Sequence, residues 1–191
     1  SLEDEALGEM ADMHHQLEDK AAGTDNGMMT LPLYHGMLVD EQMKDLDFQA
    51  TDFSKNFRDF IDSIRQPEER KIELPAGLKA DLREYQETGF KWMKSLSQYG
   101  LGGILADDMG LGKTVQCITY ILSEIEDNGR DAPFLIVAPA SLVYNWRNEF
   151  HKFAPGLSVA IAAGNKKERR AVLESEETQD VYITSYHTLR Q

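Results

Sequence analysis

Hydrophobic positions after residue 75 follow two alternating patterns. Apolar residues three and four positions apart predict helices, of which the first two end at Gly100 and Gly129. Short continuous apolar runs predict strands at 102–106, 134–138, 157–162 and 181–184. Continuous apolar strands separated by helices are typical of a parallel sheet with both faces covered, so the pattern predicts an α/β fold. The helical stripes are Leu82, Tyr85, Gly89, Trp92, Met93 and Leu96; Val115, Ile118, Leu122 and Ile125; and Leu142, Trp146, Phe150 and Phe153, before a charged helix at 166–173.

The first 74 residues show a different, mainly helical pattern. An acidic amphipathic helix is predicted over 1–20, followed by turn residues at 23–27. A second helix is predicted from an aromatic and aliphatic stripe, with Asp52 as its N-cap and Pro67 beyond its end. We therefore expect an acidic helical segment at 1–74 and a separate lobe at 75–191. The stripe consists of Phe53, Phe57, Phe60, Ile61 and Ile64.

Charge supports this division of the 191-residue chain. The net charge is −13, but residues 1–75 hold 18 acidic and 7 basic side chains, whereas residues 76–191 hold 15 and 13. The near-neutral lobe is therefore free to carry a local basic face, and the overall acidity does not exclude nucleic acid as a partner. No apolar run reaches the roughly 18–20 residues of a membrane span, and the single Cys117 excludes an internal disulfide. We expect a cytoplasmic protein without a membrane partner.

The segment between the first predicted strand and its helix has the composition of a phosphate-binding loop. It reads Asp107-Asp108-Met109-Gly110-Leu111-Gly112-Lys113-Thr114 (residues 107–114, the phosphate loop). Glycines let the backbone turn its N–H groups inward, and the following helix adds its positive dipole end. Lysine can reach the β- and γ-phosphates, and the threonine hydroxyl can bind Mg²⁺. The strict consensus has glycine where Asp107 stands, so we expect both aspartates to point away from the phosphates.

Four blocks of the lobe resemble the Swi/Snf-type ATPases of helicase superfamily two, in a bacterial-looking form. The resemblance covers residues 76–191 in the family's order and spacing. It implies a RecA-like lobe that binds ATP and Mg²⁺, as part of a DNA-stimulated ATPase and translocase. The blocks are Leu82-Arg83-x-Tyr85-Gln86-x-x-Gly89-x-x-Trp92, the run from Gly103 to Thr114, Leu135 to Trp146, and Ile183-Thr184-Ser185-Tyr186-x-Thr188-Leu189.

The resemblance also implies roles for single residues. Gln86 would read the adenine edge, since its amide offers a donor and an acceptor; an exposed helical glutamine is the alternative. Lys113 and Thr114 would act in catalysis, with Thr114 also binding Mg²⁺. The expected nucleotide-binding residues are Gln86, Asp108, Met109, Gly110, Leu111, Gly112, Lys113 and Thr114.

Two groups of residues are candidates for contact with double-stranded DNA. The first group is Ser141, Thr184 and Ser185, whose hydroxyls could contact DNA phosphates. Ser141 could instead cap a helix, and Thr184 could instead cap a strand end. A basic cluster on the charged helix could bind the DNA backbone or form a solvated face. The cluster consists of Lys166, Lys167, Arg169 and Arg170.

In the family, an aspartate–glutamate pair that binds Mg²⁺ and activates water follows the last block. This chain ends at Gln191 before such a pair, lacks the second RecA-like lobe and opens with Ser1 rather than Met, so we expect an excised piece. We expect it to bind Mg²⁺–ATP without hydrolysing it efficiently, while the longer protein acts on DNA and on a DNA-bound protein complex. Alternatives are a P-loop ATPase unrelated to nucleic acid and an inactive interaction scaffold. Residues 1–74 would be a brace on the lobe or a regulator that occupies the DNA path.

Overall fold

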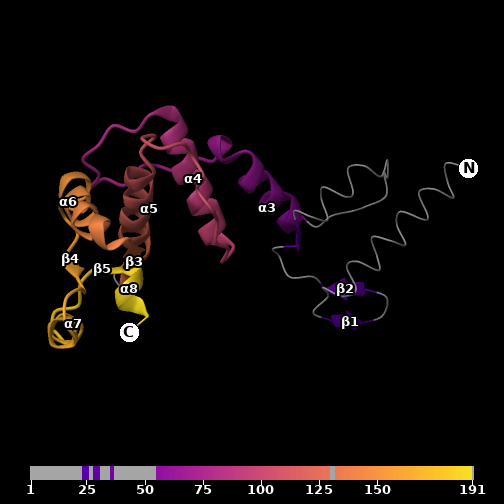
Figure 1. Ribbon diagram of the computed structural model, residues 1–191. Helices are drawn as coiled ribbons and strands as arrows, with labels where there is room; N and C mark the ends of the chain where they lie inside the picture. Colours follow the sequence, from indigo (N-terminus) through magenta and orange to yellow (C-terminus); the bar gives the residue numbers. More distant parts are fainter. Residues whose placement is uncertain (1–22, 26–27, 31–34, 37–54, 130–131, 191) are drawn as a thin grey trace, which may run out of the picture. The chain divides into compact units, whose positions relative to one another are not determined.

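The computed structural model describes residues 23–25, 28–30, 35–36, 55–129 and 132–190 (Figure 1). Their contacts divide into two compact units. One unit comprises the described residues up to Glu69 together with Ser95–Gly102, and the other comprises Arg70–Lys94 and Gly103–Gln191. All candidate site residues named above lie in the second unit.

The first unit contains two short strands and a helix. β1 (Gly23–Asp25) pairs antiparallel with β2 (Met28–Thr30), across part of the predicted turn. α3 (Lys55–Arg65) confirms the second predicted helix, and a 3₁₀ helix follows at Pro67–Glu69. Phe60, Ile61 and Ile64 are buried, and the Phe60 ring meets the Tyr99 ring edge to face with centroids 4.9 Å apart. The helix predicted at 1–20, Asp52 and Phe53 lie outside the described residues.

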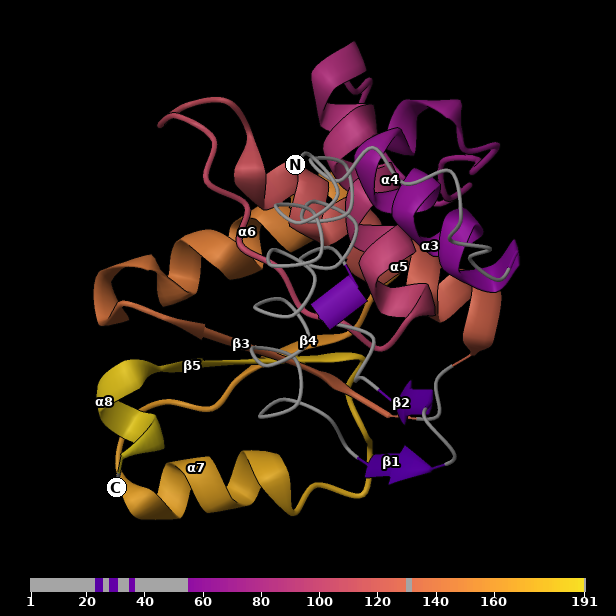
Figure 2. The same cartoon turned by 90° about the vertical axis from the view of Figure 1, so that its right-hand side faces the viewer.

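The second unit is built on a parallel sheet, as predicted. Among the described residues its strands are β3 (Phe134–Ala138), β4 (Val159–Ile161) and β5 (Val181–Ser185), in the order β3-β5-β4. The predicted helices are α4 (Glu84–Gln98), α5 (Lys113–Asn128), α6 (Val143–Phe153) and α7 (Lys166–Leu173), and a short α8 (Tyr186–Leu189) follows β5. Figures 1 and 2 show α5 and α6 on one side of the sheet and α7 on the other.

The core of this unit lies between the sheet and the apolar faces of α5 and α6. Ile118, Phe150 and Ile183 are fully buried there. The Trp146 ring packs against this cluster, which confirms its prediction as a core residue. Glycines end the helices where predicted: Gly100 and Gly129 have φ angles of +65° and +81°. Both values are left-handed conformations that glycine adopts without strain.

The strand predicted at 102–106 is wrong. Residues 101–108 have no regular structure, and the Ile104 side chain is 87% exposed. A strand is stabilised by hydrogen bonds to a neighbour, and this segment pairs with no strand among the described residues. Gly102 and Gly103 further disfavour the extended state because they carry no side chain to pack. The phosphate loop is therefore followed by its helix, α5, but is not preceded by the predicted strand.

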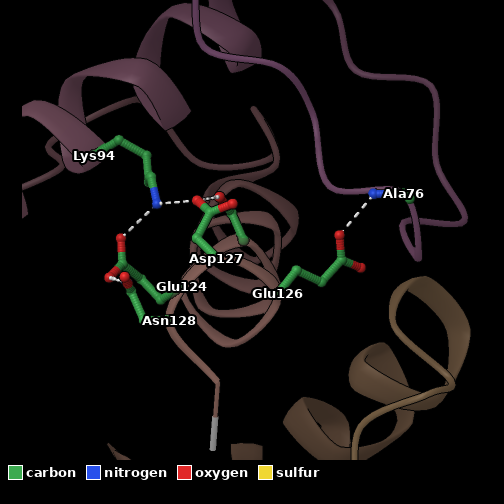
Figure 3. A network of polar contacts seen from close by, with 7 residues as sticks. Ala76, Lys94, Glu124, Glu126, Asp127 and Asn128 are labelled. Carbon is green, nitrogen blue, oxygen red and sulfur yellow. Dashed lines mark hydrogen bonds and ion pairs between the residues drawn. The ribbon is translucent and has the colours of Figure 1, made fainter.

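Polar contacts join α5 to the segments before it (Figure 3). The Lys94 ammonium on α4 lies 2.7 Å from Glu124 Oε1 and 2.7 Å from Asp127 Oδ2. The Glu126 carboxylate accepts hydrogen bonds from the backbone N–H groups of Ala76 and Gly77, at 2.8 and 2.9 Å. These contacts fix α4 and the chain at 76–77 against the helix that carries the phosphate loop.

Candidate functional site

The phosphate loop turns through two glycines in left-handed backbone conformations. Gly110 has φ +86°, and Gly112, the N-cap residue of α5, has φ +80° and ψ 36°. A side chain at either position would strain the backbone. Because Gly112 has no side chain, it offers no cap to the amide N–H groups that begin α5. The loop therefore leads into a helix start whose N–H groups can bind an anion.

The Lys113 side chain lies over the backbone of its own loop. Its ammonium donates hydrogen bonds to the carbonyl oxygens of Asp107 and Asp108, at 2.7 and 2.8 Å. Neither contact is an ion pair with a carboxylate. Phosphate oxygens can replace neutral carbonyl oxygens around an ammonium group, since hydrogen bonds between ionised partners are the stronger kind. Among the residues that the structure describes, the lysine is thus held at the loop without a competing carboxylate.

The two aspartates of the loop have different surroundings. The Asp107 carboxylate is half-buried, and its Oδ2 accepts a hydrogen bond from the Gln116 side-chain amide at 3.2 Å. Asp108 is exposed, as is Met109, whose side chain is 96% exposed. Thr114 is half-buried in the first turn of α5. The structure thus anchors one carboxylate of the loop on α5.

Gln86 is buried and braces the loop from α4. Its Oε1 accepts from the Arg83 backbone N–H at 3.0 Å, and its Nε2 donates to the Leu111 carbonyl at 3.0 Å. A side chain at Gly112 would overlap Gln86 Nε2, so the glycine is also needed for this close approach. The alternative of an exposed helical glutamine is wrong. The amide uses both its acceptor and its donor within the protein, in contacts that position the loop.

The candidate DNA-contact residues on β5 have partners inside the protein. The Thr184 side chain is buried, and its hydroxyl donates to the Ala162 carbonyl at 2.8 Å. Ser185 is buried too, and its Oγ accepts from the Thr188 backbone N–H at the start of α8. Both hydroxyls therefore hold local structure in this conformation, the first by joining β5 to the end of β4 and the second by capping a helix.

Ser141 lies in a 3₁₀ helix, Ala140–Leu142, and is exposed. α6 begins after Leu142, so the prediction that Ser141 caps this helix is wrong. The serine follows the carboxyl end of β3, and Ser185 ends β5 in register with Ala138. Because carboxyl ends of parallel strands meet at one edge of a sheet, both serines lie at the edge where ligands of open α/β sheets gather.

The basic cluster occupies α7, which follows β4. The Asn165 side chain caps this helix by accepting hydrogen bonds from the N–H groups of Lys167 and Glu168. In turn, the Glu168 carboxylate accepts a hydrogen bond from the Asn165 N–H. Arg169 donates to the Gly164 carbonyl at 2.7 Å, and Arg170 pairs with Glu174 at 2.6 Å. Lys166 and Lys167 are exposed. The two arginines thus have local roles, and the two lysines present their charge to solvent.

Two polar side chains around the loop were not predicted as site residues. The Tyr85 hydroxyl donates to the Leu111 carbonyl at 3.2 Å, beside the bond from Gln86. Gln116 is fully buried among apolar residues of α5 and holds Asp107. Tyr85 was counted in an apolar stripe. The signal for Gln116 was a polar residue next to the apolar stripe of the predicted helix, two residues after the loop.

Within the described part of the chain, no three His, Cys, Asp or Glu side chains are grouped so that they could hold a metal ion. No described helix has the length and apolar character needed to cross a membrane. Residues such as His14 and His15 lie outside the part described.

Relatives of the chain are numerous, and their lengths exceed its own. It is 36% identical over 194 residues to an uncharacterized ATP-dependent helicase of Mycoplasma pneumoniae, covering 99% of this chain and 18% of that one. It is 35% identical over 196 residues to the TATA-binding protein-associated factor MOT1 of Saccharomyces cerevisiae, covering 96% and 10%. The chain therefore spans between a tenth and a fifth of the length of these relatives.

A solved structure and two family models complete the comparison. The structure is the SWI2/SNF2 ATPase core of Sulfolobus solfataricus in complex with double-stranded DNA, with 38% identity, a TM-score of 0.55, and coverage of 63% of this chain and 24% of that one. The model of bacterial SNF2 helicase-associated segments matches residues 1–75. The model of the SNF2-related domain matches residues 85–191, more than half of the chain. With the RecA-like arrangement of its sheet and helices, the chain belongs to the SNF2 family of helicase-like ATPases.

Proposed function

We propose that this chain is the ATP-binding lobe of a Swi/Snf-type, DNA-stimulated translocase. The observation that supports this most strongly is the phosphate loop itself. Two left-handed glycines lead into the start of α5, and the Lys113 ammonium lies on neutral carbonyl groups beside it. A triphosphate is bound by backbone N–H groups, a helix start and a cation, and the helix start and the cation lie together at this loop.

The proposed roles follow from these positions. The backbone of residues 108–112 would hold the β- and γ-phosphates together with Lys113, and the Thr114 hydroxyl would bind Mg²⁺. The ion, when bound, neutralises charge on the phosphate oxygens. Gln86 would read adenine only by exchanging one of its present hydrogen bonds, with Arg83 or Leu111. Its contact with Leu111 would then link the base to the loop.

We assign hydrolysis to a longer protein. The relatives described above are several times longer than this chain. In the family pattern, an aspartate–glutamate pair and a second RecA-like lobe complete the reaction site. The lobe described here would hold the nucleotide, and the remaining parts would activate water and stabilise the leaving phosphate.

Two measurements test this function. Calorimetry of the 191-residue chain with Mg²⁺–ATP should show one site per chain, and no heat of binding at saturating nucleotide would contradict the proposal. The ATPase rate of the longer protein should rise when duplex DNA is added. Equal rates with and without DNA would favour a P-loop ATPase unrelated to nucleic acid, and turnover by the chain alone at the rate of the longer protein would contradict the division of roles.

We further propose that double-stranded DNA contacts the carboxyl edge of the sheet and α7. The related structure from Sulfolobus solfataricus is an ATPase core bound to double-stranded DNA. In this chain, Ser141, Lys166 and Lys167 are exposed near that edge, after β3 and β4. Thr184 and Ser185 are buried and would need a local rearrangement to take part.

Replacing Lys166 and Lys167 together by alanine should reduce the salt dependence of DNA affinity in the longer protein. Each lysine that neutralises a phosphate releases a counterion, so the slope of log affinity against log salt should fall by up to about 2. The control is Lys152→Ala, which removes an exposed lysine of α6. Fluorescence anisotropy with labelled duplex DNA at several salt concentrations gives the slope. An unchanged slope would remove α7 from the proposed interface.

A further inference from the structure

Gln116 is a polar side chain in a position that packing alone would fill with an apolar one. It is fully buried on α5, between buried neighbours such as Val115 and Thr119. Its Nε2 donates to Asp107 Oδ2 at 3.2 Å. Its Oε1 is buried and meets no hydrogen-bond partner among the described residues. The amide therefore makes one bond, to the aspartate that opens the phosphate loop.

The cost of this arrangement indicates that it does not serve stability. A buried acceptor without a partner destabilises the folded state, because it loses its hydrogen bonds to water. The surrounding structure is nevertheless shaped around the amide: a side chain at Gly89 of α4 would overlap Gln116 Oε1. Gly89 thus leaves the space that Gln116 occupies, three residues after Gln86 on the same helix.

The charge of Asp107 supplies a reason. Its carboxylate precedes a loop that would hold several phosphate oxygens, and like charges a few ångströms apart repel. The half-buried carboxylate is tied through Gln116 to α5. Lys113, one turn earlier on α5, bonds to the Asp107 carbonyl and not to its carboxylate. The lysine charge is thereby left for a ligand.

We propose that Gln116 is a positioning residue for nucleotide binding, whose amide anchors the Asp107 carboxylate on α5 and keeps it off the phosphates. Gly89 provides the space for that amide. The inference rests on the proposed function, since it concerns the same nucleotide. It adds a residue that touches neither the phosphates nor the base, and acts only through Asp107.

The test compares Gln116→Met in two backgrounds, using Mg²⁺–ATP as the probe in calorimetry with the 191-residue chain. Methionine has a similar length and fills the same space without the amide. In the wild-type background it should weaken binding about tenfold, because a released carboxylate a few ångströms from the phosphates would repel them. In the Asp107→Asn background, which has no charge to anchor, the same change should alter affinity by less than about twofold.

Stability measurements separate positioning from packing. Gln116→Met removes the unpaired acceptor, so the melting temperature without nucleotide should not fall although binding weakens. Thr119→Val is the matched control: it removes another buried polar group of α5, one turn further from the loop, and should leave affinity unchanged within about twofold.

Several results would overturn the proposal. They are an equal loss of affinity in both backgrounds, no loss in the wild-type background, or parallel losses of stability and affinity. Asp107→Asn alone keeps the amide and is expected to bind Mg²⁺–ATP at least as tightly as wild type; weaker binding would show that the carboxylate helps to bind the nucleotide. If the wild-type chain binds no Mg²⁺–ATP, the proposed function itself fails, which is a distinct result.

Discussion

Lys113→Ala is expected to lower the ATPase rate of the longer protein at least about 100-fold, with or without duplex DNA. The structure places this ammonium on two carbonyl oxygens of the phosphate loop, at 2.7 and 2.8 Å, and alanine removes that cation. Alanine is favourable in a helix, so α5 should still form. The loss of two hydrogen bonds to the loop should cost only about 1–2 kcal/mol of stability. The rate is measured by phosphate release at saturating ATP.

The matched control is Lys79→Ala, which removes an exposed lysine before α4. Its backbone N–H, which donates to the Phe153 carbonyl, is unaffected by the substitution. This variant should hydrolyse ATP at the wild-type rate. A Lys113→Ala protein that keeps the wild-type rate would contradict the assignment of residues 107–114 as the triphosphate site.

Lys94→Met is expected to lower the free energy of unfolding of this chain by about 3 kcal/mol. The side chains of Lys94 and Glu124 are only 13% and 16% exposed, and the substitution leaves the Glu124 carboxylate without its cation. Asp127 is 59% exposed, so water replaces the lost contact there. Urea unfolding, followed by circular dichroism, gives the free energy. Lys79→Met should change it by less than about 0.5 kcal/mol.

A second substitution distinguishes lost charge pairing from lost packing. In Lys94→Met/Glu124→Gln, no buried charge remains unpaired, so most of the stability should return. An equally unstable double variant would show that the aliphatic stem of Lys94, rather than its charge, fixes α4 on α5.

The stability difference between wild type and Lys94→Met should also depend on pH. Burial alone would lower the pKa of Lys94, but its hydrogen bonds and charge interactions with Asp127 and Glu124 outweigh this effect and raise the pKa above its ordinary 10.5. The hydrogen bond from Lys94 lowers the pKa of Asp127 below its ordinary 3.8. The difference should therefore be constant between about pH 5 and pH 9, decrease at acid pH as Asp127 becomes protonated, and decrease above 10.5 as Lys94 loses its proton. A difference that changes within the neutral range would contradict this assignment.

Hydrophobic spacing predicted the helices and most strands because burial of one face requires that spacing. α5 and α6 have their apolar stripes against the sheet, as the intervals from Val115 to Ile125 and from Leu142 to Phe153 indicated. The failure at 102–106 has a physical reason too. An apolar run records a tendency to extend, whereas a strand also requires a neighbour with free hydrogen-bonding groups, and spacing along one chain carries no information on that neighbour.

Some residues of the candidate site could be predicted from the sequence and others could not. The glycines and Lys113 were recognisable because their chemistry depends on local backbone geometry. The hydroxyls of Thr184 and Ser185 were ambiguous, since a residue at a strand end can bind a ligand or its own backbone, and only the atoms at 2.8–3.2 Å decide. Gln116 was missed because its partner, Asp107, lies nine positions earlier and is brought to it by the turn of the loop.

The Glu126 contacts bring two distant parts of the chain onto one helix. α5 begins at the phosphate loop. About 20 Å further along its axis, Glu126 accepts hydrogen bonds from the backbone N–H groups of Ala76 and Gly77. These two residues follow directly on the stretch matched by the helicase-associated model, which ends at residue 75. α5 therefore connects the phosphate loop at its start with the chain at Ala76 and Gly77 near its end.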